Sequence, residues 1–357
     1  MVMEKIPAPA FRVFQKFEET SKREGLFPEK GVVIAGVSGG VDSMLLLAFL
    51  KRVSKSIPFH LTACHLDHQI RGEEARLDRE LVKSFCEAAS IPLQIFSVDI
   101  PLYAAKMKMG LEEAGRIKRR ELFEKAGEEQ LKILKLVGEY RIALAHHMDD
   151  RAESILMHIG RGTGLRGLVG IRYIDGPYIR PLLDIRRSEV EEAASALGLP
   201  WRDDRSNVSD EFLRNRIRNQ LIPAWEETVG YDPTPLIVRL GDLAFHDDEA
   251  LEELATESFR KALLPDFSLS VSSLMSLPYA IYSRVIQLFY LTMAEPQEGK
   301  KRAPRELTTM QLETLRRLSE DIQSGKQTRA QLSWPGGSVV TIAEGRIWLS
   351  WPDKTNE

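Results

Sequence analysis

The feature that most constrains this chain is a strand that turns through two glycines directly into a helix, within residues 32–50. Residues 32–34 form a short apolar run rich in β-branched side chains, which is typical of a buried parallel strand. The chain breaks at Ser-Gly-Gly and resumes at Met44 as an almost wholly apolar helix. Such a turn binds anions, because glycines let the backbone approach a ligand and the free N–H groups of the helix start point toward it.

A phosphate-binding loop is therefore predicted over SGGVDS. Asp42 and Ser43 stand at its mouth, and a carboxylate beside bound phosphates is favourable mainly when a divalent cation such as Mg²⁺ bridges the two. The loop has neither the Gly-Lys-Ser/Thr of a Walker loop nor the spaced GxGxxG of a dinucleotide site. An ordinary glycine turn is the alternative, but the aspartate and both serines favour a ligand site. The loop residues are Ser38, Gly39, Gly40, Val41, Asp42 and Ser43.

Composition limits the classes of protein that remain. A chain of 357 residues has room for two or three domains, and its net charge of −3 means that a nucleic-acid partner must be argued from local basic patches. Cys64 and Cys86 are the only cysteines and form no CxxC, which argues against structural zinc, an iron–sulfur cluster or a disulfide framework. No signal-peptide core or membrane-length apolar run is present, so we expect a cytoplasmic protein without a membrane partner.

Strands that alternate with helices predict the fold of the first part of the chain. We expect strands at 32–34, 59–64, 93–98 and 142–145, with a helix over 73–89. This alternation predicts an α/β Rossmann-like domain, over residues 1–222, with a parallel sheet covered by helices on both faces and ligands at the carboxyl ends of the strands.

The pattern changes beyond residue 222. Residues 236–262, 273–293 and 308–324 read as amphipathic helices, and residues 338–342 and 346–349 as a closing hairpin. We therefore expect a mainly helical second domain over 223–357.

The segment HLDHQIRGEE follows the second expected strand and gathers His65, Asp67, His68 and Arg71. These side chains allow a metal site, but on a turn they are more often ordinary polar loop residues. Near a nucleotide, Arg71 is better suited to a phosphate or ribose contact.

Residues 112–125 read as a charged helix. Its arginines can form i, i+4 pairs on a solvated face, and without other information that interpretation is favoured. Arg116 and Arg119 lie about one turn apart, however, so both can point to one side.

The second strong motif is HHMDDRAE, which follows the fourth expected strand. Asp150 and Glu153 share a helix face, with Asp149 close to it, directly behind His146 and His147. The helix dipole accounts for part of this acidity, but three carboxylates exceed what capping needs. They are suited to bind Mg²⁺, to hold an ammonium group, or to take a proton from an attacking amine.

Two basic segments complete the pattern. GRGTGLRG at 160–167, with Arg161, reads as a loop that touches phosphate, the alternative being a flexible linker. Residues 212–219 read as a helix with a buried stripe of Leu213, Ile217 and Leu221. Its arginines would form a local basic patch for phosphates, although bare charges of this kind more often face solvent. They are Arg214, Arg216 and Arg218.

These segments together resemble the tRNA(Ile)-lysidine synthase family of N-type ATP pyrophosphatases. The resemblance rests on SGGVDS, HLDHQIRGEEARLD at 65–78, EEAGRIKRRELF at 112–123, AHHMDDRAE at 145–153, GRGTGLRGL at 160–168 and DDRSN…FLRNRIR at 203–218. It implies a C–N bond-forming ligase whose substrates are ATP, an isoleucine tRNA with a CAU anticodon and free L-lysine. ATP adenylates the C2 carbonyl oxygen of the wobble cytidine, and the lysine ε-amine then attacks C2 and expels AMP.

The resemblance also implies roles for individual residues. Catalysis is assigned to Asp42 (with Mg²⁺), Arg116, His146, Asp150 and Glu153. The glycine loop, Arg71 and Arg161 would bind ATP, and Arg119 would join Arg214, Arg216 and Arg218 as tRNA or phosphate contacts.

Two departures from the family pattern leave points open. Arg120 stands where the family has an aromatic residue, so either Arg116 or Arg119 can be the catalytic arginine. The chain is also shorter than the long members, so residues 220–357 are expected to recognise the tRNA. A homodimer is compatible with the sequence.

Three rival functions share parts of this sequence pattern. A tRNA thiolase needs cysteines for a cluster or persulfide, and neither cysteine lies in a suitable motif. A GMP or NAD synthetase acts without RNA, which the FLRNRIR block and the helical tail argue against. A non-catalytic nucleotide-binding protein would not need Asp42, Asp150 and Glu153, and ATP–pyrophosphate exchange would separate it from an enzyme.

Overall fold

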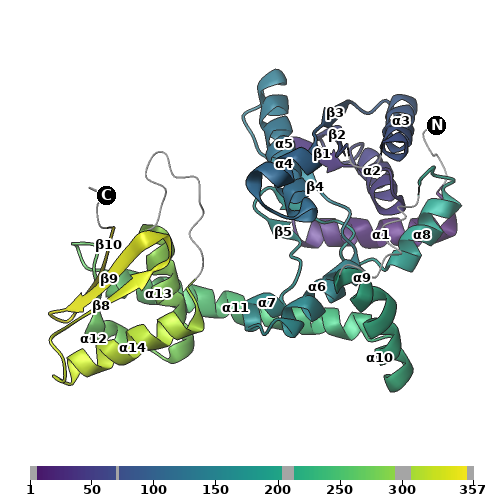
Figure 1. Ribbon diagram of the computed structural model, residues 1–357. Helices are drawn as coiled ribbons and strands as arrows, with labels where there is room; N and C mark the ends of the chain where they lie inside the picture. The colour runs from purple at the N-terminus through teal and green to yellow at the C-terminus, as the bar shows by residue number, and fades with distance from the viewer. Residues whose placement is uncertain (1–5, 70–71, 203–212, 294–306, 352–357) are drawn as a thin grey trace. The chain divides into compact units, whose positions relative to one another are not determined.

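The computed structural model describes residues 6–69, 72–202, 213–293 and 307–351 (Figure 1). The chain divides into two compact units, Met1–Leu243 and Ala244–Glu357. Each unit has a hydrophobic core of its own and is described by itself.

A six-stranded sheet in the order β3-β2-β1-β4-β6-β5 forms the centre of the first unit. All neighbouring strands are parallel except β5, which runs antiparallel to β6. The predicted parallel sheet and its four strands are thus confirmed, whereas β5 and β6 were not predicted because each is only two residues long. The strands are β1 (Val32–Gly36), β2 (His60–Asp67), β3 (Leu93–Ser97), β4 (Tyr140–Ala143), β5 (Ile174–Asp175) and β6 (Tyr178–Ile179).

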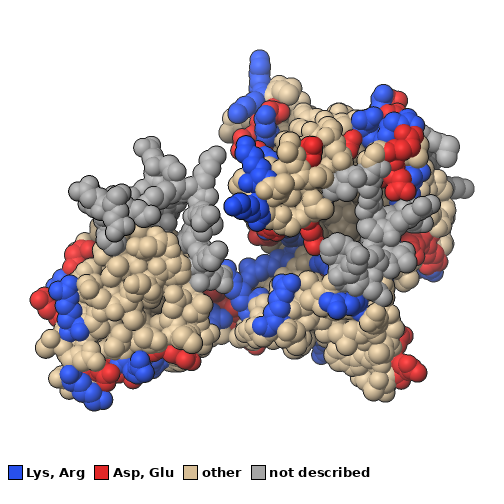
Figure 2. Space-filling model, in the orientation of Figure 1, with Lys and Arg blue, Asp and Glu red and all other residues tan. Residues whose placement is uncertain are grey.

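Helices cover both faces of this sheet. On one face α2 packs with α1 and α8 around Phe17, Leu45 and Phe49, and α3 adds Val82 to the same core. On the other face α5 places Phe123 against the side chains of β1 and β4, and its basic side chains gather at the surface (Figure 2). The helices are α1 (Ala8–Arg23), α2 (Val41–Val53), α3 (Glu73–Ala89), α4 (Ile100–Met107), α5 (Leu111–Ile133) and α8 (Arg187–Ala196).

A smaller apolar cluster attaches a helical layer beside the sheet. Ile155 and Leu156 of α6 pack with Ile217, Ile237 and Val238, which belong to the helices that follow residue 212. The first unit therefore ends after Leu243 rather than at the expected residue 222, because the start of α11 packs on α6. The elements are α6 (Met148–Gly160), α7 (Leu165–Leu168), α9 (Leu213–Arg216), a π-helix (Ile217–Leu221), α10 (Ile222–Val229) and α11 (Thr234–Ala262).

The expected buried stripe of the basic helix is wrong in two of its three positions. Ile217 is buried, but Leu213 and Leu221 are exposed, and Asn215 is buried instead. At Ile217 the helix changes to π geometry, whose i→i+5 hydrogen bonds shift the faces relative to an α-helical repeat. A stripe drawn at i, i+4 therefore loses its register at Leu221, beyond the change, while Leu213 lies at the exposed start of α9.

The second unit combines helices with a four-stranded antiparallel sheet in the order β7-β10-β9-β8. The predicted hairpin is confirmed as β9 and β10, which turn at Glu344 and Gly345, both with positive φ. Strand β8 was not predicted, and the helix expected over 273–293 is two helices, α12 and α13. The elements after α11 are β7 (Leu269–Ser270), α12 (Val271–Met275), α13 (Tyr279–Met293), α14 (Thr309–Gln323), β8 (Arg329–Trp334), β9 (Ser338–Ala343) and β10 (Arg346–Ser350).

Within the described residues, helices long and apolar enough to cross a membrane are absent.

Candidate active site

The glycine loop forms the predicted strand–turn–helix. Gly39 has a φ of +98°, a conformation that L side chains rarely adopt, and Gly40 caps the start of α2. The Ser43 hydroxyl accepts from the backbone N–H groups of Ser38 and Gly39 at 3.2 and 3.3 Å, and it donates to the Gly40 carbonyl at 2.9 Å. The loop is thus held in shape by its own last residue, with its backbone at the carboxyl end of β1.

Four adjacent strands each bring an unpartnered polar atom to this edge of the sheet. Among the described residues, Asp42 Oδ1, His65 Nε2, His146 Nδ1 and Arg180 Nε are buried without a hydrogen-bond partner. His65 lies near the carboxyl end of β2, and the other three residues follow β1, β4 and β6. Leaving such an atom unpaired costs about 1–3 kcal/mol. Four of them along one edge therefore mark the place where a polar ligand or ordered water binds.

His147 joins the loop to α6. It is the N-cap residue of α6, and its Nε2 lies 3.9 Å from Asp42 Oδ1 and 3.5 Å from Asp150 Oδ2. Burial disfavours the imidazolium, but the carboxylates of Asp150, Asp149 and Asp42 outweigh it and raise the pKa of His147. Burial also raises the pKa of Asp42, against the attraction of His147. The Asp42 carboxylate thus faces the imidazole of His147, whose protonated and positively charged form is favoured.

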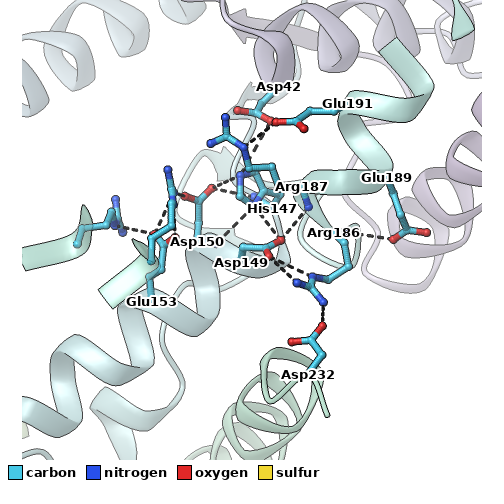
Figure 3. A network of polar contacts seen from close by, with 12 residues as sticks. Asp42, His147, Asp149, Asp150, Glu153, Arg186, Arg187, Glu189, Glu191 and Asp232 are labelled. Carbon is cyan, nitrogen blue, oxygen red and sulfur yellow. Dashed lines mark hydrogen bonds and ion pairs between the residues drawn. The ribbon is translucent and has the colours of Figure 1, made fainter. Parts of the chain in front are cut away.

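Asp149 is held by the chain itself (Figure 3). Arg186 donates two hydrogen bonds to Asp149 Oδ1, at 3.1 and 2.9 Å, and the backbone N–H of Arg187 donates to Oδ2 at 2.8 Å. Arg186 also pairs with Asp232. Burial opposes the charge of Asp149, but the interaction with His147, whose Nδ1 lies 3.5 Å from Oδ2, and the hydrogen bonds from Arg186 and Arg187 prevail and lower its pKa. This carboxylate fixes α6 to the start of α8 and has little capacity left for a ligand.

Asp150 and Glu153 bind arginines from α9 and from the π-helix that follows it. Arg218 donates to Glu153 at 2.6 and 3.1 Å and to Asp150 Oδ1 at 3.3 Å, and Arg214 Nε lies 3.4 Å from Glu153. Glu153 is 0% exposed, and this burial raises its pKa against the influence of Arg218. The structure therefore has a two-carboxylate site for a cation immediately beside the glycine loop.

The arginines of α5 lie in different surroundings. Arg116 pairs with Glu113, one turn earlier, at 2.7 Å, and its side chain is 57% exposed. Arg119 Nη2 lies 3.5 Å from His68 Nε2, and its charge also acts on His146. The structure thus brings Arg119 to the edge of the sheet and leaves Arg116 in a local surface pair.

The other predicted residues are more scattered. Arg161 is exposed at the end of α6, about 16 Å along the helix from Asp150 at 1.5 Å per residue. Arg216 is exposed on the other side of α9 from Arg214 and Arg218. Arg71 and the DDRSN segment lie outside the described residues.

A metal site at HLDH has no support in the part of the chain that the structure describes. No group there of three or more His, Cys, Asp or Glu side chains has an arrangement that could hold a metal. His65 Nδ1 lies 2.8 Å from the Val37 carbonyl oxygen and supports the chain beneath the glycine loop, while His68 contacts Arg119.

Sequence reasoning missed Arg180. It follows the two-residue strand β6 and is 9% exposed; its Nη1 donates to the Arg172 carbonyl at 2.7 Å. The signal was an arginine directly after the apolar Tyr178–Ile179, the same placement that singled out the histidines after β4. Arg186 and Arg187 were missed as the partners of Asp149.

The fold and the site define the class of this protein: an α/β domain with a glycine-loop phosphate site at the carboxyl edge of its parallel sheet. The chain belongs to the PP-loop domain family, whose model matches residues 10–225. The PP-loop part of the resemblance drawn from the motifs is thereby confirmed.

Two curated relatives of the chain are tRNA(Ile)-lysidine synthases. The chain is 33% identical over 292 residues to the tRNA(Ile)-lysidine synthase of Caldanaerobacter subterraneus, covering 81% of this chain and 61% of the relative. It is 36% identical over 250 residues to the tRNA(Ile)-lysidine synthase of Clostridioides difficile, covering 70% and 53%. The chain thus spans between half and about three fifths of the length of these relatives.

A solved structure agrees on the fold. The U34-tRNA thiolase NcsA from Methanococcus maripaludis superimposes with a TM-score of 0.53 at 23% identity, covering 66% of this chain and 80% of the thiolase. At this identity the likeness supports the shared fold alone.

Proposed function

We propose that this chain is a lysidine-forming ligase that acts on an isoleucine tRNA with a CAU anticodon. The observation that carries the proposal is the cation site of Asp150 and Glu153 beside a pyrophosphate-type glycine loop. In a reaction that adenylates one substrate and then lets an amine attack it, the phosphate site and the cation site must lie next to each other. The similarity to tRNA(Ile)-lysidine synthases supports the same reaction.

In the first step the glycine loop holds the β- and γ-phosphates of ATP through its backbone N–H groups. The C2 carbonyl oxygen of the wobble cytidine attacks the α-phosphorus, a P–O bond to it forms, and the bond to pyrophosphate breaks. Arg119, at the edge of the sheet, is placed to stabilise negative charge on the α-phosphate, and Arg116 is the alternative.

Asp42 fits Mg²⁺ in this step, because its Oδ1 is a buried carboxylate oxygen without a hydrogen-bond partner. Mg²⁺ is commonly held by one or two carboxylates together with substrate phosphates. The ion, when bound, would neutralise charge on the pyrophosphate leaving group.

In the second step Asp150 and Glu153 hold the ε-ammonium of lysine in place of Arg218. Burial raises the pKa of Glu153, whereas its neighbours lower that of Asp150 in spite of burial. Glu153 is therefore the better proton acceptor, and Asp150 remains charged and orients the amine. The neutral amine attacks C2, the C–N bond forms, and the bond from C2 to the oxygen of AMP breaks.

The tRNA is proposed to contact Arg214, Arg216 and Arg218 and the second unit. The cytidine must leave its stack to reach the loop, and this costs little in a single-stranded anticodon loop. A reaction on tRNA in a reducing compartment agrees with a cytoplasmic protein.

Thiolation of tRNA is the nearest rival function. Cys64 and Cys86 are both buried, and burial raises the pKa of their thiols to about 12 and about 11. Since the thiolate is the reactive form, neither cysteine is a good nucleophile. These observations favour the ligase.

The test is incorporation of labelled lysine into an unmodified isoleucine CAU tRNA transcript with ATP and Mg²⁺. We expect incorporation by the wild-type chain, none into methionine CAU tRNA, and none by Asp42→Ala. Adenylation of a different acceptor without lysine transfer would keep the nucleotide site and overturn the proposed substrate.

A further inference from the structure

Arg180 is a buried cation with weak compensation inside the protein. Its nearest carboxylate in the described part of the chain, Asp175, lies 3.9 Å away and is itself largely exposed. By contrast, Arg218 donates two hydrogen bonds to Glu153, at 2.6 and 3.1 Å. Arg180 Nε is also buried without a hydrogen-bond partner. A buried charge is costly unless it is paired, so this guanidinium is suited to receive an anion from a ligand.

A second unsatisfied donor lies within electrostatic reach of it. His146 Nδ1 is buried without a partner. Burial, together with the positive charges of Arg180, Arg214 and Arg119, lowers the pKa of His146 to about 4 in spite of Asp150. The imidazole is therefore neutral near pH 7, and in one tautomer Nδ1–H donates a hydrogen bond. Arg180 and His146 together offer two donors and one positive charge.

The position of this pair in the sheet separates it from the phosphates. β6 is the second strand from β1, with β4 between them, which places Arg180 about 10 Å from the line of the glycine loop at 4.8 Å per strand. Asp150 and Glu153 stand on α6, which follows the intervening strand β4. The sheet edge thus presents, in order, a phosphate site, a cation site and an anion site.

We propose that Arg180 and His146 bind the α-carboxylate of the lysine substrate while Asp150 and Glu153 hold its ε-amine. This inference rests on the proposed function and deepens it by naming the residues that select an amino acid over a simple amine. The cationic end of such a ligand matches the carboxylates of Asp150 and Glu153, and its anionic end matches His146 together with Arg180, which follows the next strand, β6. Arg180 Nε–H and His146 Nδ1–H donate hydrogen bonds to the carboxylate oxygens. Both bonds are charge-assisted, and in the one from the Arg180 guanidinium donor and acceptor are both ionised.

The experiment compares L-lysine with L-lysinamide, which keeps both amines but has no carboxylate. Kinetic constants for both are measured with Arg180→Gln, Arg180→Lys and Arg141→Gln. Arg141 is a matched control, since it lies at the opposite end of the neighbouring strand β4 and also has a buried Nε without a partner. Thermal unfolding of each variant and tRNA-dependent ATP–pyrophosphate exchange are measured alongside.

For Arg180→Gln we expect the KM for lysine to rise on the order of tenfold to a hundredfold, as for loss of a charge-assisted hydrogen bond. The KM for lysinamide and the exchange reaction should change little, Arg180→Lys should recover part of the effect, and Arg141→Gln should behave as wild type. An equal rise in the KM for lysine and for lysinamide would overturn the inference. A rise in the KM for ATP would also overturn it, because it would assign Arg180 to a phosphate. A wild-type chain that uses neither amine would instead overturn the proposed function.

Discussion

Two helices of the first unit carry clusters of arginines, and the structure uses them in opposite ways. On α5, Arg116 forms an exposed pair with Glu113 one turn away. On α9 and the π-helix, Arg214 and Arg218 reach Glu153, a fully buried residue more than 60 positions earlier in the chain. The sequence patterns of the two helices look alike, but their surroundings do not.

The difference lies in solvation. An exposed pair such as Arg116–Glu113 is typically worth less than about 1 kcal/mol, because water screens it and two long side chains must be ordered. The pair of Arg218 with Glu153 excludes water on the carboxylate side, so removing one partner leaves the other charge buried and unpaired. Charge spacing along a helix therefore does not indicate what a charge contributes.

The largest effect on stability is expected for Arg218→Ala. Loss of the partner of Glu153 should lower the free energy of unfolding by about 3 kcal/mol at neutral pH, the lower part of the range for a broken buried pair, since Arg218 itself is partly exposed. Burial already raises the pKa of Glu153, and without Arg218 it rises further. The loss should therefore shrink as the pH falls below this raised pKa, because a protonated Glu153 needs no cation.

Chemical denaturation across pH checks this result, and the double variant Arg218→Ala/Glu153→Gln should be more stable than Arg218→Ala alone at neutral pH. A pH-independent loss would mean that Arg218 acts through packing rather than through charge.

Arg119→Ala should show the next largest effect, on activity rather than on stability. If Arg119 stabilises charge on the α-phosphate, its loss should lower kcat on the order of 100-fold, whereas Arg116→Ala should change kcat only a few-fold. Both variants should unfold within about 0.5 kcal/mol of wild type, since both residues are exposed. Lysine incorporation by the two variants decides the point, and a larger loss in Arg116→Ala would reverse the assignment.

The carboxylates around His147 raise its pKa, so the stability of the fold should depend on pH through this residue. Because Asp150, Asp149 and Asp42 raise the pKa of His147 despite burial, its ion pairs stabilise the fold fully below the ordinary histidine value. This contribution is lost as the pH rises through the raised pKa. His147→Asn, which keeps a capping side chain, should thus differ from wild type by about 1 kcal/mol at pH 6 and by less at pH 9. Histidine NMR titration locates the pKa, and a value below the ordinary one would contradict the geometry.

Arg216→Ala should have the smallest effect. Arg216 is exposed on the far side of α9 from Glu153, so unfolding should change by less than about 0.5 kcal/mol. If it contacts a tRNA phosphate, binding should weaken for all tRNAs, and the slope of log K against log salt should fall by about 1. Filter binding at several salt concentrations measures the slope. An unchanged slope would leave Arg216 as a solvated charge only.

Several features could be predicted from the sequence because they are local. The strand, glycine turn and helix around Ser38 to Ser43 follow from β-branched residues, a position that requires positive φ at Gly39, and an apolar helix start. Alternation of strands and helices was enough for the parallel sheet, and the histidine–aspartate motif for the start of α6. The site roles of these residues stay predictions.

Only the tertiary structure decided which charges are paired. Asp149 and Asp150 are neighbours with equal prospects in the sequence, yet Arg186 takes the first and Arg218 the second, each from a distant segment. Arg180 reaches the site after a strand too short to predict. Local sequence determines backbone conformation through the preferences of each residue, whereas the partner of a charge depends on which segments packing brings together and on how much water that packing removes.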